Sequence, residues 1–141
     1  MLFRSRIAQI DIGLANNTCF LSQATIASKG TTVEISQNYS VEIMDKGELQ
    51  IINLLPTNIK LPLETKITPQ DEILELVIKT KTKKSIFNQE FDYSVFQIKK
   101  ALIKNSKYPV ILDNTISIAT PVEIGLLKKK LSIIVGRNRN F

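Results

Sequence analysis

The 141-residue chain contains no histidine and no tryptophan, and it has a single cysteine, Cys19. Without histidine, a Ser–His–Asp triad and a histidine-ligated metal site are excluded. One cysteine forms neither an internal disulfide nor a cysteine-rich zinc cluster. No apolar run approaches the roughly 18 residues of a membrane helix, and the opening residues 1–6 are too short for a signal peptide. These absences favour a non-enzymatic protein without a cofactor or metal.

The basic side chains gather in the second half of the chain. Lysine and arginine number 19 against 13 acids, which gives a net charge of +6. Residues 1–70 carry as many acids as bases, so residues 71–141 hold the whole excess. Clustered bases suit a polyanion, because each phosphate contact releases counterions, although a solubilising surface without a ligand is the other interpretation. The candidate RNA-binding residues are Lys79, Lys81, Lys83, Lys84, Lys104, Lys107, Lys128, Lys129, Lys130, Arg137 and Arg139.

Most of the sequence has the alternating apolar pattern of β-strands, interrupted by polar turns. A 43% hydrophobic content over this length is typical of a globular protein. One segment, residues 95–103, fits either a short helix or a strand. The predicted strands cover residues 7–14, 18–28, 33–35, 40–43, 48–55, 110–112, 116–118 and 130–135.

Residues 69–79 are predicted to form a helix. Thr68 suits the capping position, a proline follows at the first helical position, and two acids occupy the first turn. The apolar residues of the segment recur at helical spacing, although a strand over the same residues is the alternative. Asp71, Glu72 and Glu75 are then interpreted as solvated acids near the helix start rather than as an acid–base site.

Two segments of the β pattern resemble each other. Residues 33–43 align with residues 110–120, and each is followed by a loop and a matching strand. Chance similarity between short β segments is the alternative to a true repeat. The repeat predicts an α+β protein of two small units of antiparallel sheet, the first completed by the 69–79 helix. The predicted units are residues 1–80 and a basic, truncated unit of residues 81–141.

Short motifs in both halves carry a resemblance to a known family. The first half has Ser5-Arg6-Ile7, Lys29-Gly30 and Asp45-Lys46-Gly47-Glu48 in order, and the second has Lys107-Tyr108-Pro109-Val110 and Thr120-Pro121. In this order they are similar to the bacterial and organellar members of the universal large-subunit ribosomal protein six family. The resemblance implies a diverged member that lacks the family's C-terminal helix and basic tail.

Membership of that family would make the chain a structural constituent of the large ribosomal subunit. It would take part in translation by binding ribosomal RNA and neighbouring ribosomal proteins through its basic second half, reading RNA by shape and backbone phosphates. The resemblance implies no enzymatic activity, no cofactor, no membrane contact and no small-molecule substrate. Ile, Lys and Asn have A/T-rich codons and are frequent, which suggests a mitochondrial or other organellar ribosome, or otherwise the cytoplasm of an AT-rich bacterium.

Two further interpretations remain open. A β-rich assembly subunit, for instance of a phage or a secretion particle, would bind protein partners through open strand edges. A metal-dependent enzyme similar to RNase H-like nucleases or actin-like ATPases would use Asp11 at a strand end, with Asp113 as a second ligand. No glycine-rich phosphate loop accompanies these acids. Cys19 lies in a predicted strand and is interpreted as a buried structural thiol.

Overall fold

The structure, a computed structural model, describes residues 5–55, 67–82, 90–127 and 130–136. These residues form fourteen β-strands and no helix, so none of them belongs to a helix that could span a membrane. The strands are β1 (Ser5–Ile10), β2 (Gly13–Ala15), β3 (Thr18–Phe20), β4 (Gln23–Ala27), β5 (Thr31–Ser36), β6 (Tyr39–Ile43), β7 (Gly47–Ile52), β8 (Leu74–Lys81), β9 (Phe91–Ile98), β10 (Ala101–Lys104), β11 (Val110–Leu112), β12 (Ile116–Ile118), β13 (Val122–Leu126) and β14 (Leu131–Gly136).

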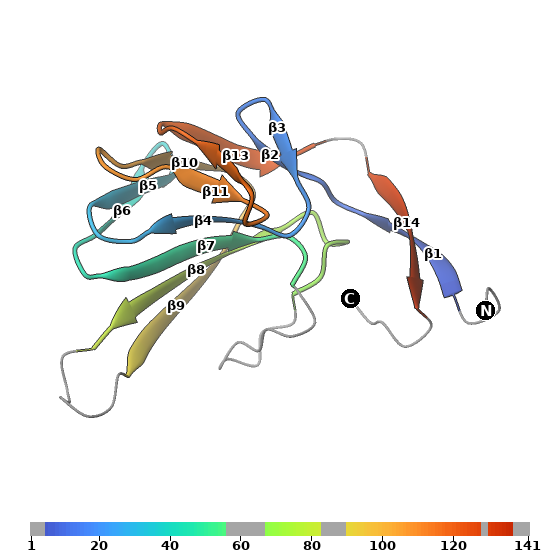
Figure 1. Cartoon of the computed structure of the whole chain (residues 1–141), viewed down its shortest axis with the longest axis horizontal. Helices are drawn as coiled ribbons and strands as arrows, with labels where there is room; N and C mark the ends of the chain where they lie inside the picture. Colours follow the sequence, from blue (N-terminus) through green and yellow to red (C-terminus); the bar gives the residue numbers. More distant parts are fainter. Residues whose placement is uncertain (1–4, 56–66, 83–89, 128–129, 137–141) are drawn as a thin grey trace.

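Two packed sheets make the body of the protein, and a separate two-stranded ribbon extends from it (Figure 1). The first sheet has the strand order β3-β2-β13-β10-β5-β6, and the second has the order β12-β11-β4-β7-β8-β9. The ribbon pairs β1 with β14. All of these pairings are antiparallel. The described residues therefore form an all-β sandwich, and the predicted α+β class is wrong.

The hydrophobic core lies between the two sheets, because successive side chains of a strand point to opposite faces. In β13, Val122 and Ile124 are buried, whereas Glu123 between them is exposed. Phe20 is the largest fully buried side chain and joins the aliphatic residues of both sheets. A Cβ atom on Gly13, its cross-strand partner, would collide with the Phe20 ring, so this close packing needs a glycine.

The segment predicted as a helix, residues 69–79, is instead a turn followed by strand β8. Asp71 Oδ1 accepts a hydrogen bond from Ile73 N at 3.0 Å, so an acid that suits a helix start here closes an Asx-type turn. β8 lies between β7 and β9, and its residues Leu74–Ile78 are all buried. A strand covered on both faces has a continuous apolar run, which periodicity does not distinguish from a buried helix.

The two segments that resemble each other are both hairpins, but they do not define two repeated units. Residues 33–43 lie in the β5–β6 hairpin of the first sheet, and residues 110–120 contain the β11–β12 hairpin of the second. Strands from both halves of the chain are neighbours in both sheets, since β13 pairs with β2, β10 with β5 and β11 with β4. The predicted boundary after residue 80 falls within β8. Residues 95–103 form the end of β9, a turn and most of β10.

The chain crosses from the first sheet to the second between β3 and β4, and two polar side chains hold this crossing. The Asp113 carboxylate accepts hydrogen bonds from the backbone nitrogens of Leu21 (2.8 Å), Ser22 (2.7 Å) and Gln23 (3.1 Å). Asn53 Nδ2 donates to Leu21 O at 3.1 Å, and its backbone nitrogen donates to Ser22 O. Partly buried backbone groups are costly to leave unpaired, so these contacts stabilise the crossing.

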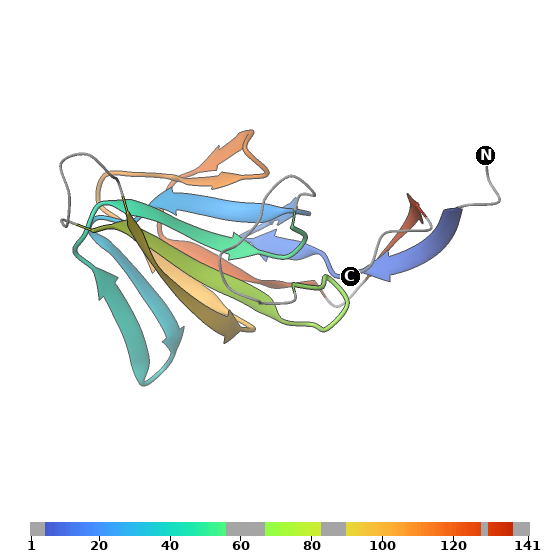
Figure 2. The same cartoon turned by 90° about the horizontal axis from the view of Figure 1, so that it is seen from below.

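The β1–β14 ribbon lies outside both sheets, as two views show (Figures 1 and 2). Ala8 and Val135 are buried on one of its faces. On the other face Ile7 and Ile134 are cross-strand partners, and they are 75% and 70% exposed. The ribbon thus brings the first and last described strands together and presents an apolar pair to solvent.

Candidate functional site

A cavity of about 450 Å³ opens beside β2 and β13, where the ribbon joins the sandwich. Its lining combines apolar and charged side chains from segments that are distant in sequence. The apolar residues are Leu14, Ile124, Leu126 and Leu127, and the charged residues are Asp11, Glu72, Lys99, Lys100 and Glu123. A concave site with an apolar lining and a few charged groups is the usual form of a small-molecule site.

Asp11, between β1 and β2, is a buried carboxylate of this lining whose two oxygens both have partners. Its Oδ2 accepts a hydrogen bond from Glu72 N at 2.8 Å, and its Oδ1 lies 3.2 Å from Lys130 Nζ. Its backbone nitrogen donates to Pro69 O, and its carbonyl oxygen accepts from Asn53 Nδ2 at 2.7 Å. Asp11 therefore joins the start of β2 to the segments before β8 and β14, and is already engaged as an acceptor.

The positive charge of the cavity comes from the turn between β9 and β10. Lys99 and Lys100 are exposed there, and no described carboxylate lies within ion-pair distance of either ammonium group. Across the cavity, Asn16 Oδ1 accepts a hydrogen bond from Glu123 N at 2.9 Å and fixes the β2–β3 turn against β13. This arrangement suits an amphipathic molecule, with its apolar part on the leucines and a phosphate or hydroxyl group at the lysines.

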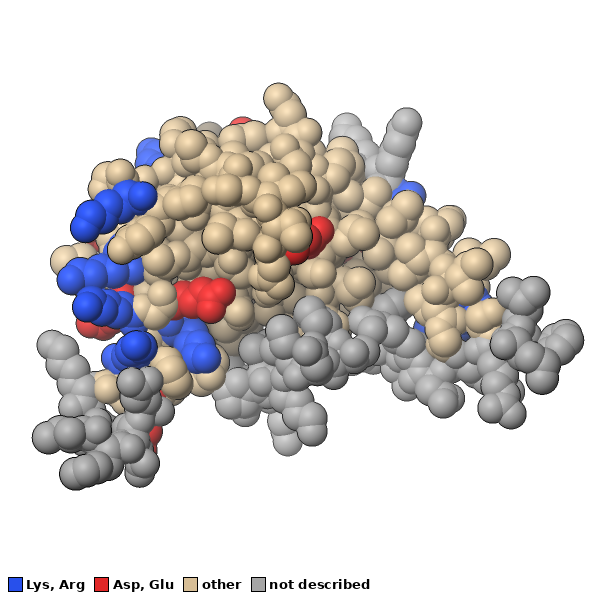
Figure 3. All heavy atoms as spheres, viewed as in Figure 1, with Lys and Arg blue, Asp and Glu red and all other residues tan. Residues whose placement is uncertain are grey.

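The predicted phosphate-binding bases that the structure describes occupy two separate regions. Lys79, Lys81, Lys104 and Lys107 lie at the end of the sandwich formed by the last residues of β8 and β10 and the β10–β11 turn. Figure 3 shows Lys and Arg side chains gathered at the end on the left. Lys130 lies near the ribbon, where it pairs with a buried carboxylate. That the first four bind a polyanion stays a prediction. Outside the described residues lie Lys83, Lys84, Lys128, Lys129, Arg137 and Arg139.

The structure does not assemble the metal site that Asp11 and Asp113 suggested. Asp113 is engaged by three backbone amides at the β3–β4 crossing, whereas Asp11 is engaged by Glu72 and a lysine at the cavity. Among the described residues no group of three or more His, Cys, Asp or Glu side chains could hold a metal ion. Cys19, interpreted as buried, is exposed on edge strand β3.

Glu75 is a buried acid that the sequence interpretation missed, since it was assigned to a solvated helix start. It lies in β8, between β7 and edge strand β9, is 0% exposed, and neither of its carboxylate oxygens has a hydrogen-bond partner. Burial, together with the nearby Asp71 carboxylate, raises the pKa of Glu75 from 4.5 to about 7. As a strand, this segment places Glu75 and Val77 on the same face. Because the segment was interpreted as a helix, this alternation was not considered.

No family model matches the chain, and no curated protein matches it by sequence. Its fold is similar to a solved structure of a diacylglycerol kinase from Bacillus anthracis strain Sterne, with 18% identity, a TM-score of 0.65, and coverage of 86% of this chain and 52% of that chain. A candidate diacylglycerol kinase from the same organism has 16% identity, a TM-score of 0.67, and coverage of 86% and 55%. The chain thus spans about half the length of the structures it matches.

These findings correct the family interpretation. The structures that share the fold are described as diacylglycerol kinases rather than ribosomal proteins, and the described residues form no helix-completed unit. Three predictions are therefore wrong: that the chain is a ribosomal constituent, that it is not an enzyme, and that it binds only ribosomal RNA and proteins and no small-molecule substrate. The motifs behind them are short turn and strand segments, which unrelated β proteins also contain. The compartment stays a prediction.

Proposed function

We propose that this chain is the lipid-binding β part of a diacylglycerol kinase-type enzyme, and that the cavity beside β2 and β13 holds the acceptor lipid. The observation that carries the proposal is the shared fold, which covers 86% of the chain in structures described as diacylglycerol kinases. The cavity adds suitable chemistry, because its leucines offer an apolar surface to the acyl groups. Lys99 and Lys100 lie at the same cavity, where they would contact a phosphate group.

A kinase also needs a nucleotide, with its metal ion, and the residues of this chain do not fit that role. The sequence has five glycines and no glycine-rich phosphate loop. The described residues contain no cluster of three potential metal ligands. We therefore assign only the acceptor side to this chain. Phosphoryl transfer would depend on nucleotide-binding residues other than those of this cavity.

The acceptor proposal predicts that Leu14→Asp weakens the binding of dioctanoylglycerol at least about tenfold, because a charge would then contact the apolar part of the ligand. Leu14 is a half-buried residue of the cavity lining. Tyr39→Asp is the matched control, because Tyr39 is exposed on β6 and does not line the cavity. Titration calorimetry of the purified chain measures both affinities. The absence of binding by the native chain, or equal binding by both variants, would contradict the proposal.

The lysine pair gives a second, independent prediction. Lys99→Ala with Lys100→Ala is expected to weaken the binding of dioctanoyl phosphatidic acid about tenfold while leaving dioctanoylglycerol affinity unchanged, because only the first ligand has a phosphate. The same titration measures both. Equal losses for the two ligands would show that the lysines do not contact the phosphate group.

A further inference from the structure

The end of the sandwich away from the ribbon is built from turns that carry exposed lysines. Lys29 lies in the β4–β5 turn, Lys46 in the β6–β7 turn and Lys107 in the β10–β11 turn, and all three are exposed. Lys79 and Lys81 lie in the last three residues of β8. These five lysines form the basic end of the protein. In Figure 3 the blue side chains gather at this end of the visible face, whereas the middle of that face is largely uncharged.

Backbone and side-chain hydrogen bonds hold the turns of the basic end next to one another. Asn105 Nδ2 donates to Lys29 O at 3.2 Å, and Asn105 Oδ1 accepts from Lys107 N at 2.8 Å. The β6–β7 turn joins them, because Gly30 N donates to Ile43 O at 2.9 Å. The end of β8 joins through a hydrogen bond of 3.0 Å between the backbone groups of residues 81 and 46. The lysines therefore belong to one surface.

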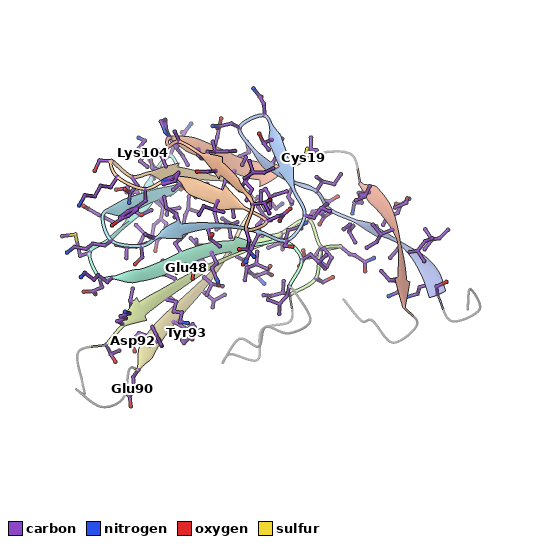
Figure 4. The ribbon with its side chains drawn as sticks, in the orientation of Figure 1. Cys19, Glu48, Glu90, Asp92, Tyr93 and Lys104 are labelled. Carbon is purple, nitrogen blue, oxygen red and sulfur yellow. The ribbon has the colours of Figure 1, made fainter. Side chains whose placement is uncertain are left out.

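The lysines of the basic end are not neutralised within the described part of the chain. None of the five has a described carboxylate within ion-pair distance, whereas the neighbouring Lys104 is paired with Glu34 at 2.8 Å. Acids are present nearby: Asp45 and Glu48 belong to the β6–β7 turn and the start of β7. Figure 4 shows Lys104 and Asp92 at opposite corners of this end. A partner with regularly spaced negative charge would therefore find unpaired cations here.

A hollow of about 360 Å³ lies within the basic end. It is lined by Lys46, Lys79 and Lys81 together with Gly47, Glu48 and Phe91. The Lys79 ammonium lies 4.2 Å from the centre of the Phe91 ring, which holds its charge beside the hollow. Three lysines against one carboxylate give this lining a net positive charge, which suits a phosphate group.

Two large apolar side chains project from the same turns. Met44 directly precedes the Asp45-Lys46 turn and is 71% exposed, and Tyr108 directly follows Lys107 and is 44% exposed. Most of the Met44 side chain and a little under half of Tyr108 therefore face solvent. Apolar tips beside lysines match the layered chemistry of a membrane surface, in which phosphate groups lie next to acyl chains. Nucleic acid offers phosphates without such an apolar layer, so it accounts for the lysines alone.

We propose that the basic end docks on the surface of an anionic phospholipid membrane, with the lysines at the lipid phosphates and with Met44 and Tyr108 at the acyl boundary. The juxtaposition of unpaired lysines and exposed apolar tips on three joined turns carries this inference. It does not depend on the acceptor-lipid proposal, because the cavity lies at Lys99 and Lys100, which precede β10, whereas the basic end lies beyond the other end of that strand.

The test is co-sedimentation of the full chain with phosphatidylcholine vesicles that contain or lack phosphatidylglycerol and contain no diacylglycerol. We expect binding only to the anionic vesicles. Lys29→Ala with Lys107→Ala is expected to weaken it about 25-fold, at about fivefold for each lysine. Gln37→Glu with Asn38→Asp, in the exposed β5–β6 turn, lowers the net charge by the same amount away from the basic end and the cavity, and is the matched control, expected to bind as the native chain does. Equal losses in both double variants would overturn the proposal, because net charge alone would then explain the binding.

Two further measurements distinguish a membrane from other partners. Met44→Ser with Tyr108→Ser is expected to weaken vesicle binding about tenfold at unchanged net charge, and unchanged binding would overturn the role of the tips. A duplex RNA competitor is expected to leave the vesicle-bound fraction unchanged. Displacement by the RNA at low stoichiometry, lost in the Lys29 and Lys107 variant, would overturn the membrane assignment in favour of nucleic acid. Because the acceptor-lipid test uses soluble lipid and different residues, each proposal fails independently of the other.

Discussion

Replacing Glu75 by glutamine is expected to stabilise the protein above pH 7 by about 2–3 kcal/mol, and to change its stability little below pH 4.5. Glu75 is fully buried, and both its carboxylate oxygens are without partners. Above its pKa of about 7 the native protein must hold an unpaired buried charge. The amide of glutamine has nearly the same shape as the protonated acid and never ionises, so the variant avoids that cost.

The direction of the pH dependence follows from the raised pKa. Between about pH 4.5 and pH 7 the unfolded chain has lost the Glu75 proton while the folded chain keeps it. The contribution of Glu75 is therefore full below pH 4.5, falls as the pH rises, and is constant above about 7. Urea unfolding at several pH values measures this for the native chain and Glu75→Gln. Glu42→Gln, on exposed β6, is the matched control. If the native and Glu75→Gln profiles run parallel, Glu75 is not the source of the pH dependence.

Removing the Asp113 side chain is expected to lower the free energy of unfolding by about 3 kcal/mol, because three backbone amides would lose a charged acceptor. Those amides belong to the β3–β4 crossing, which lies about ninety positions earlier in the chain than Asp113. No other described side chain replaces the carboxylate there. The loss should therefore loosen the link between the two sheets rather than a single turn.

The choice of substitution separates the hydrogen bonds from the turn. Asp113 and Asn114 have positive φ angles of 47° and 60°, the pattern of a type I′ turn, which glycine adopts without strain. Asp113→Gly thus removes the carboxylate and keeps the turn, whereas Asn114→Gly changes the turn alone and is expected to be nearly neutral. Urea unfolding at constant pH measures both. Native stability in Asp113→Gly would show that the amides are satisfied without this carboxylate.

The positions of many strands could be predicted from the sequence, but their arrangement could not. Alternation and polar turns marked the strands around Val33 and Ile116 correctly, because apolar and polar residues alternate in both segments and polar turns bound them. The sequence interpretation missed strand β8, because Leu74–Ile78 are buried on both faces and Thr68 and Asp71 are also typical of a helix start. Pairings such as β2 with β13 join residues more than a hundred positions apart, and no local pattern encodes them. Two similar hairpins could therefore pass for a repeated unit.

The candidate site was predictable only in part. Clustered bases near Lys79 and Lys104 were visible in the sequence, and that they bind a polyanion stays a prediction. The cavity was not visible, because Leu14, Lys99 and Leu126 lie in unremarkable local patterns and meet only through the sheet order. The whole-chain resemblance was misleading for a physical reason: turns and short strands obey the same local rules in unrelated folds.

The pairing of β1 with β14 determines how this protein would respond to a force that pulls Ser5 and Gly136 apart. Ser5 lies opposite Gly136 at the outer end of the ribbon, and Ile10 lies opposite Leu131 at its inner end. Such a force would thus open the ribbon one residue pair at a time from the outer end, instead of shearing all pairs together. The ion pair between Asp11 and Lys130, just inside, would bear the load next. The sandwich would keep its shape until that contact has parted.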